Sequence, residues 1–218
     1  MKLIFLILFL VLPAKIWADT ISFQVSHYDD EYIATVLGST DITEEFSMDA
    51  EVDTTGYLEL GGGYGVIIGR WYIEGFASYG RADNIDVYDL GGLIATSITK
   101  AFTVYFISYY QWRETKGFPI LELEWFDQQE WKNTLGLAYS PVPWFEVSIS
   151  GNYDILTSSH ERVGEVENKS INSQDVTLTF KHKMIEPFIR YTTGVHRVRP
   201  GELITRDDSV EIGVSANF

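Results

Sequence analysis

The sequence predicts an all-β protein, an antiparallel up-and-down β-barrel of about ten strands that crosses a membrane, with eight to twelve strands as the acceptable range. Three observations support this fold class. The last strand alternates strictly between apolar and polar residues, the connections between strands alternate between short and long, and the two faces of most strands differ in polarity. No helical periodicity follows the first 18 residues.

The last nine residues give the clearest signal. One face of this strand is apolar and the other is polar, so one face meets an apolar medium and the other meets water or polar groups. The apolar face holds Val210, Ile212, Val214, Ala216 and Phe218, and the polar face holds Glu211, Gly213, Ser215 and Asn217. The competing interpretation is an ordinary amphipathic strand at the end of a soluble β protein.

The N-terminus is typical of a secretory leader. Lys2 is followed by an uncharged apolar run over residues 3–12, and Ala18 is a suitable small residue at the cleavage point. The run is shorter than the roughly 20 residues of a spanning helix. We therefore expect residues 1–18 to be a cleaved signal peptide and residues 19–218 to form a single barrel domain.

The composition restricts the partners and the source of stability. Residues 19–218 hold 14 basic residues, because Lys2 and Lys15 lie in the leader, and 31 acidic residues, so the net charge is −17. Nucleic acid is not expected as a partner of so acidic a chain. Cysteine is absent, although small exported domains often depend on disulfides. A closed barrel would provide stability by pairing every backbone group around the ring.

The strands are expected where apolar residues recur at every second position. Each expected strand is bounded by turn residues or by a polar stretch, as at Gly69, Lys100, Pro143 and Pro187. The expected ranges are 20–27, 57–67, 71–80, 87–98, 102–113, 131–139, 145–155, 175–183, 188–197 and 210–218. Residues 28–56 are expected to be a long acidic loop. Twelve strands would result if 31–38 or 118–125 formed further strands.

The polar strand faces are expected to line a lumen and the apolar faces to contact lipid. Charges of both signs stand among small residues on the polar faces, which predicts a narrow interior that is filled by paired ions. The expected lumen charge network is Glu59, Glu74, Asp89, Arg113, Lys132, Glu146, Asp154, Lys181, Arg190 and Glu211. Aromatic residues near the strand ends predict two interfacial girdles. The competing interpretation is a lipocalin-like soluble barrel, which would need a water-facing side rich in Lys and Glu.

The closing strand resembles that of bacterial outer-membrane β-barrel proteins, in which a terminal aromatic such as Phe218 is typical and helps the barrel-assembly machinery to recognise its substrate. Residues 187–191 and 210–218 are also faintly similar to the end of the oligogalacturonate-type porins. The resemblance implies location in the outer membrane, contact with its lipid and lipopolysaccharide, short periplasmic turns, and passage of a small solute. The acidic excess departs from those porins, which carry more lumenal Arg and Lys.

The expected function is a narrow channel or a structural envelope component with a side-chain-filled lumen. One alternative is a barrel whose loops bind a host, a phage or a partner protein. The other is an enzyme at the barrel rim, for which His27 beside Asp29 and Asp30, together with His196, would be the candidate pair. No Gly-x-Ser-x-Gly or His-Glu-x-x-His motif is present. We therefore expect no enzymatic activity, no cofactor and no metal, although the acidic stretch between residues 29 and 53 could bind a hard cation such as Ca²⁺.

Overall fold

The computed structural model describes residues 19–28, 31–83, 85–115, 127–160, 170–196 and 206–218. Twelve β-strands account for almost all of these residues. They are β1 (Thr20–Tyr28), β2 (Glu31–Asp41), β3 (Phe46–Asp53), β4 (Leu58–Ile68), β5 (Trp71–Ala82), β6 (Ile85–Thr99), β7 (Phe102–Thr115), β8 (Asp127–Val142), β9 (Phe145–His160), β10 (Ser170–Phe180), β11 (Ile185–His196) and β12 (Arg206–Asn217). The expected leader, residues 1–18, lies outside the described residues.

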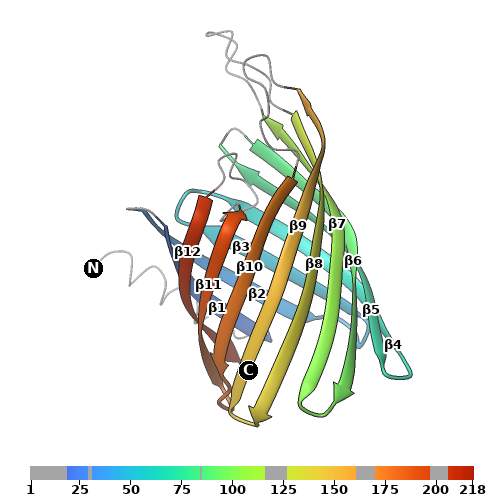
Figure 1. Cartoon of the computed structure of the whole chain (residues 1–218). Coiled ribbons are helices and arrows are strands. Elements are labelled where there is room, and N and C mark those ends of the chain that lie inside the picture. Colours follow the sequence, from blue (N-terminus) through green and yellow to red (C-terminus); the bar gives the residue numbers. More distant parts are fainter. Residues whose placement is uncertain (1–18, 29–30, 84, 116–126, 161–169, 197–205) are drawn as a thin grey trace.

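The strands form one closed antiparallel barrel in which each strand pairs with its neighbours in the chain (Figure 1). The ring closes where β1 pairs with β12, from Thr20 opposite Asn217 to His27 opposite Val210. An up-and-down topology is thus confirmed. The expectation of about ten strands is wrong by two, and the additional strands are β2 and β3. The range 118–125 lies outside the described residues.

The segment expected to be an acidic loop is instead a pair of strands. In β3, Phe46, Met48 and Val52 are exposed on one side of the sheet, and Asp49 and Glu51 border a cavity inside the barrel. The period-two alternation is therefore present in this segment, but its inward positions are carboxylates. A polar lumen accommodates such residues, whereas the interior of a soluble barrel would not.

The connections divide between the two ends of the barrel. One end of the barrel holds five connections of four residues or fewer, at residues 42–45, 69–70, 100–101, 143–144 and 181–184. The start of β1 and the end of β12 lie at the same end. We call it the short-turn end. The opposite end holds the other six connections, of which 29–30, 54–57 and 83–84 are also short and 116–126, 161–169 and 197–205 have nine to eleven residues. Within the described residues, no helix is long and apolar enough to cross a membrane.

The polarity of the molecule is inverted relative to a water-soluble protein. Large apolar side chains such as Leu60, Leu135 and Ile212 are more than half exposed, at 55%, 59% and 60%. Gln111 and Arg113, in contrast, are fully buried. A surface of this kind is stable where the surrounding medium is itself apolar, as in a bilayer.

Glycines provide space inside the barrel for large inward side chains. A Cβ added to Gly80 would lie 2.0 Å from the Tyr57 hydroxyl, and one added to Gly136 would lie 2.0 Å from the Tyr105 ring. Gly91 is the position of these three with the least freedom to adjust, because a Cβ there would meet the Tyr109 Cβ at 2.2 Å and backbone atoms of β7. Backbone and Cβ atoms cannot move aside as a flexible side chain can. Packing of the lumen thus depends on the absence of a side chain at Gly91.

Gly91→Ala should therefore destabilise the barrel by about 1–3 kcal/mol, the usual cost of overpacking. The matched control is Gly151→Ala, which replaces a strand glycine that has no atom within 4 Å of an added Cβ. Urea unfolding of the refolded proteins in detergent measures the difference. Equal midpoints for the two variants would contradict the tight packing of Gly91 against β7.

Candidate functional site

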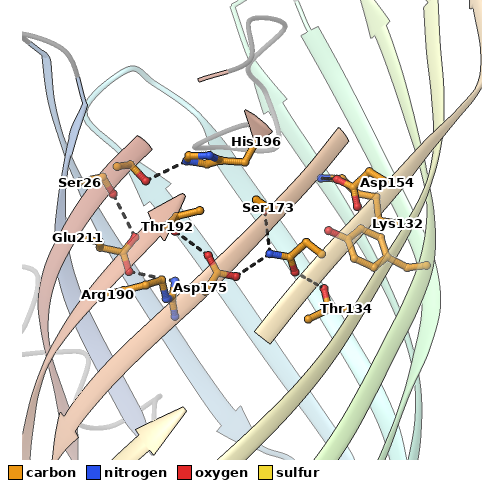
Figure 2. Close-up of a pocket in the computed structure, with 13 residues that line it drawn as sticks. Ser26, Lys132, Thr134, Asp154, Ser173, Asp175, Arg190, Thr192, His196 and Glu211 are labelled. Atoms are coloured by element: carbon orange, nitrogen blue, oxygen red, sulfur yellow. Dashed lines mark hydrogen bonds and ion pairs between the residues drawn. The ribbon is translucent and has the colours of Figure 1, made fainter. Parts of the chain in front are cut away.

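A central cavity of about 320 Å³ lies inside the barrel and is lined by residues of β1 and β7–β12 (Figure 2). Its lining is almost entirely polar, and alternation along each strand places these side chains inward. The cavity is bordered by Ser26, Tyr109, Lys132, Thr134, Asn152, Asp154, Ser173, Asp175, Arg190, Thr192, His196, Ser209 and Glu211. It is the candidate functional site.

Two ion pairs stand in the wall of the central cavity. The Arg190 Nη1 lies 3.1 Å from Glu211 Oε1, and the Lys132 Nζ lies 3.7 Å from Asp154 Oδ2. Ser26 donates a hydrogen bond to the second Glu211 oxygen at 3.1 Å. The Arg190 side chain is 44% exposed. It is therefore held by Glu211 and still reaches the open space.

Asp175 differs from these carboxylates because its hydrogen-bond partners among the described residues are all neutral. Thr192 donates to Oδ1 at 2.6 Å, and Asn152 and Ser150 donate to Oδ2 at 2.6 and 3.1 Å. Figure 2 shows Asp175 between Thr192 and the side chains around Ser173. The carboxylate is fixed in position by three hydrogen bonds from neutral donors.

A second cavity of about 360 Å³, here called the short-turn cavity, shares Arg190 with the central cavity. Lys181 donates to Glu146 at 2.7 Å in its wall, and Ser140 donates to the same Glu146 oxygen at 2.9 Å. Glu186 also lines this cavity. Arg190 thus stands where the two cavities meet, with its guanidinium carbon 5.9 Å from the centre of the Phe188 ring.

A third cavity of about 220 Å³ lies beside β2 and β3 and shares Ser22 and Leu37 with the short-turn cavity. Asp49 and Glu51 line it. The three cavities are consecutive neighbours within the lumen, each sharing lining residues with the next.

Buried polar side chains occupy the lumen on the β6–β8 side. Arg113 donates to Glu130 at 2.7 Å and to Gln128 at 3.2 Å, and it also donates to Gln111. Gln111 in turn donates to Asp89 at 3.1 Å. We call these five residues the Arg113 cluster. All five are buried. A small apolar cluster is formed by Ile85 and Val87, which share β6 with Asp89, and by Tyr57, which directly precedes β4.

The structure places the ten residues of the expected lumen network as follows. Six of them form three ion pairs, namely Lys132 with Asp154, Lys181 with Glu146, and Arg190 with Glu211; the sequence did not indicate which residues would pair. Glu59 accepts a hydrogen bond from Tyr57, Glu74 from Tyr72 and Asp89 from Gln111, so the donors to these three carboxylates are neutral side chains. Arg113 pairs with Glu130, which the sequence analysis did not include.

Sequence reasoning missed two residues for different reasons. Asp175 begins an expected strand and alternates with Thr177 and Thr179, so its inward position was available from the pattern. Glu130 lies one residue before the expected start of strand 131–139, whereas β8 begins at Asp127. Its pairing with Arg113 depends on the register between β7 and β8, which aligns Gln111 with Glu130.

The structure does not bring the candidate histidine pair together. The His27 ring stacks on Tyr32 at 4.4 Å between centroids, on β1 and β2 positions that alternate with lumenal Ser26. His196 lines the central cavity, where Nδ1 donates to the Gly194 carbonyl at 2.8 Å and Nε2 is hydrogen-bonded to the Ser209 hydroxyl at 2.9 Å. In the described part of the chain, no group of three or more His, Asp or Glu side chains is arranged to hold a metal ion.

No protein-family model matches the sequence, and no curated protein matches it significantly. Solved structures of outer-membrane porins share the fold. The NanC porin is 14% identical with a TM-score of 0.71, over 91% of this chain and 99% of that chain. The KdgM porin in complex with disordered oligogalacturonate is 15% identical with a TM-score of 0.66, again over 91% and 99%.

An outer membrane channel from Pseudomonas putida F1 has a TM-score of 0.66 at 9% identity, over 91% of this chain and 94% of that chain. Identities this low establish a shared fold alone. The chain therefore has the closed barrel architecture of outer-membrane porins, and its function must be argued from its own residues.

The Arg113 cluster makes a stability prediction. Arg113→Met leaves Glu130 buried without its cation and should destabilise the barrel by about 3–5 kcal/mol. The double variant Arg113→Met with Glu130→Gln should recover part of that loss. Arg190→Met, at a half-exposed ion pair, serves as the matched control and should cost much less. Urea midpoints of the refolded proteins give the comparison, and equal losses for both single variants would contradict a buried cluster.

Proposed function

We propose that the protein is an outer-membrane channel with a narrow, charged lumen. The observation that carries the proposal is the series of three cavities inside a closed barrel whose outer surface is apolar. The cavities share lining residues, so a small hydrated solute could move from one to the next with side-chain rearrangement at Arg190. The porin structures with the same fold support this proposal.

The lumen would be only partly filled. The Arg113 cluster occupies the β6–β8 side with fully or nearly fully buried side chains. The open space lies on the other side and narrows at Arg190 and Phe188, where the central and short-turn cavities meet. Such a pore would pass small ions and small polar solutes slowly, unlike the wide aqueous channels of larger barrels.

A planar bilayer measures this property directly. The wild type should give single-channel steps of low conductance. The double variant Glu146→Ala with Arg190→Ala should raise the conductance, because it removes Arg190 from the junction of two cavities and Glu146 from the wall of the short-turn cavity, and it should lower thermal stability. The double variant Arg81→Ala with Asp86→Ala removes an ion pair that lines none of the three cavities, so it should leave conductance unchanged.

A wide open pore in the wild type would overturn the narrow lumen, and the absence of any conductance would overturn the channel. In the second case the loop-mediated binding barrel becomes the better hypothesis. The positions of His27 and His196 do not support the alternative of an enzyme at the barrel rim.

Placement in the outer membrane is the second part of the proposal. The short-turn end would face the periplasm, residues 1–18 would be the cleaved leader, and the apolar surface would contact lipid and lipopolysaccharide. Phe218 follows β12 at that end, is 48% exposed, and donates its backbone N–H to the Asp19 carbonyl at 2.9 Å. Its position after the last paired residue suits recognition by the barrel-assembly machinery before the ring is closed.

Phe218→Ser tests that role. The folded yield in outer-membrane fractions, measured as the band that migrates faster unheated than boiled, should fall substantially. The urea midpoint of the refolded variant should fall less, because Phe218 follows the last strand of the barrel and the substitution removes only a half-exposed phenyl group. A membrane level equal to that of the wild type would contradict the recognition role.

A further inference from the structure

The fixed charges around the open part of the lumen do not balance. Carboxylates outnumber cationic side chains in the three cavities, by seven to three among the described lining residues. The three cationic residues are Lys132, Lys181 and Arg190. Each of them is within ion-pair distance of a carboxylate of the same wall. The charge that remains along the path is therefore negative.

The residual charge is distributed along the path rather than gathered at one point. Asp175 remains in the central cavity, Glu186 in the short-turn cavity, and Asp49 in the third cavity. Glu186 accepts a hydrogen bond from the Asn217 amide at 3.3 Å, a neutral donor. A mobile cation would consequently meet an unneutralised carboxylate in each cavity, whereas a mobile anion would meet cations that are already paired.

Asp175 is the carboxylate best arranged to receive a cationic group. Thr192, Asn152 and Ser150 fix both of its oxygens in the wall of the 320 Å³ central cavity. A carboxylate has about four acceptor sites, so three neutral donors leave one of them for a further donor. An ammonium group entering the cavity could make a charge-assisted hydrogen bond there.

We propose that this lumen selects cations, and that Asp175 binds the cationic group of the solute that passes through the central cavity. The inference rests on the proposed channel function and specifies its solute class. It also separates this protein from the KdgM porin with the same fold, which has been solved with oligogalacturonate, a polyanion.

The reversal potential across a planar bilayer with a KCl concentration gradient tests the inference. The wild type should give a potential of the sign for K⁺ permeation, with a K⁺ to Cl⁻ permeability ratio above one. Asp175→Asn should lower that ratio by about twofold to fivefold, the effect of one nearby charge partly screened by salt. Asp208→Asn is the matched control, because it removes the same charge from a residue that lines none of the three cavities.

The outcomes separate the two levels of the proposal. Conducting channels with a ratio at or below one overturn cation selection and leave the channel function standing. A cation-selective wild type with an unchanged ratio in Asp175→Asn overturns the role of Asp175. Absence of conductance overturns the channel function and this inference with it. If Asp175→Asn fails to show the folded, heat-modifiable band, Glu186→Gln should lower the ratio in its place.

Discussion

The pairing of β1 with β12 is the constraint on which the rest of the structure depends. It joins the first and last strands of the described ring through eight consecutive residue pairs, so no strand edge is left unpaired. A barrel without edges satisfies its backbone donors and acceptors internally, and only then can its outer surface be covered by apolar side chains in a lipid environment. Closure also explains how the chain dispenses with cysteine.

In the closed barrel the polar faces of the strands point inward, and their buried groups need hydrogen-bond or ion-pair partners there. The residues of the buried Arg113 cluster hydrogen-bond to one another, and within the described residues only the Oδ1 of Asp89 in this cluster has no hydrogen-bond partner. Glycines such as Gly91 leave space for inward aromatic side chains, because a Cβ at these positions would overlap them. Where packing is incomplete, cavities remain, and their walls combine paired ions with carboxylates such as Asp175 that are held by neutral donors. The same constraint thus produces both the filled side and the open side of the lumen.

Local sequence patterns predicted the barrel because alternation is a local property. The faces of β12 and β10 could be read from residues two positions apart, and Glu211 and Lys181 were placed inward on that basis. The strand β3 was missed although Phe46, Met48, Ala50 and Val52 alternate with polar residues, because the number of carboxylates was given more weight than their spacing. An acidic inward face is costly in a soluble core but compatible with a polar lumen.

Contacts between strands could not be predicted, because they depend on register. Nothing within residues 127–131 indicates that Glu130 meets Arg113, and nothing near Asp175 indicates that Thr192 on the next strand is a donor. His27 was considered with His196 because both were expected at the same rim. Its ring instead contacts Tyr32, a neighbour created by β2, a strand that the sequence analysis held only as an alternative. The errors in the site therefore follow largely from the errors in strand number and register.

The central claim is that the alternating faces of the strands separate lipid from a polar lumen. The absence of native cysteine allows single cysteines to be placed at successive positions of β12, from 210 to 216, and labelled with a fluorophore in a reconstituted bilayer. Labels at 210, 212, 214 and 216 should be quenched by brominated lipid, and labels at 211, 213 and 215 by a small water-soluble quencher. The same quenching by brominated lipid at every position, or none at any position, would contradict a lipid-embedded barrel with a polar interior.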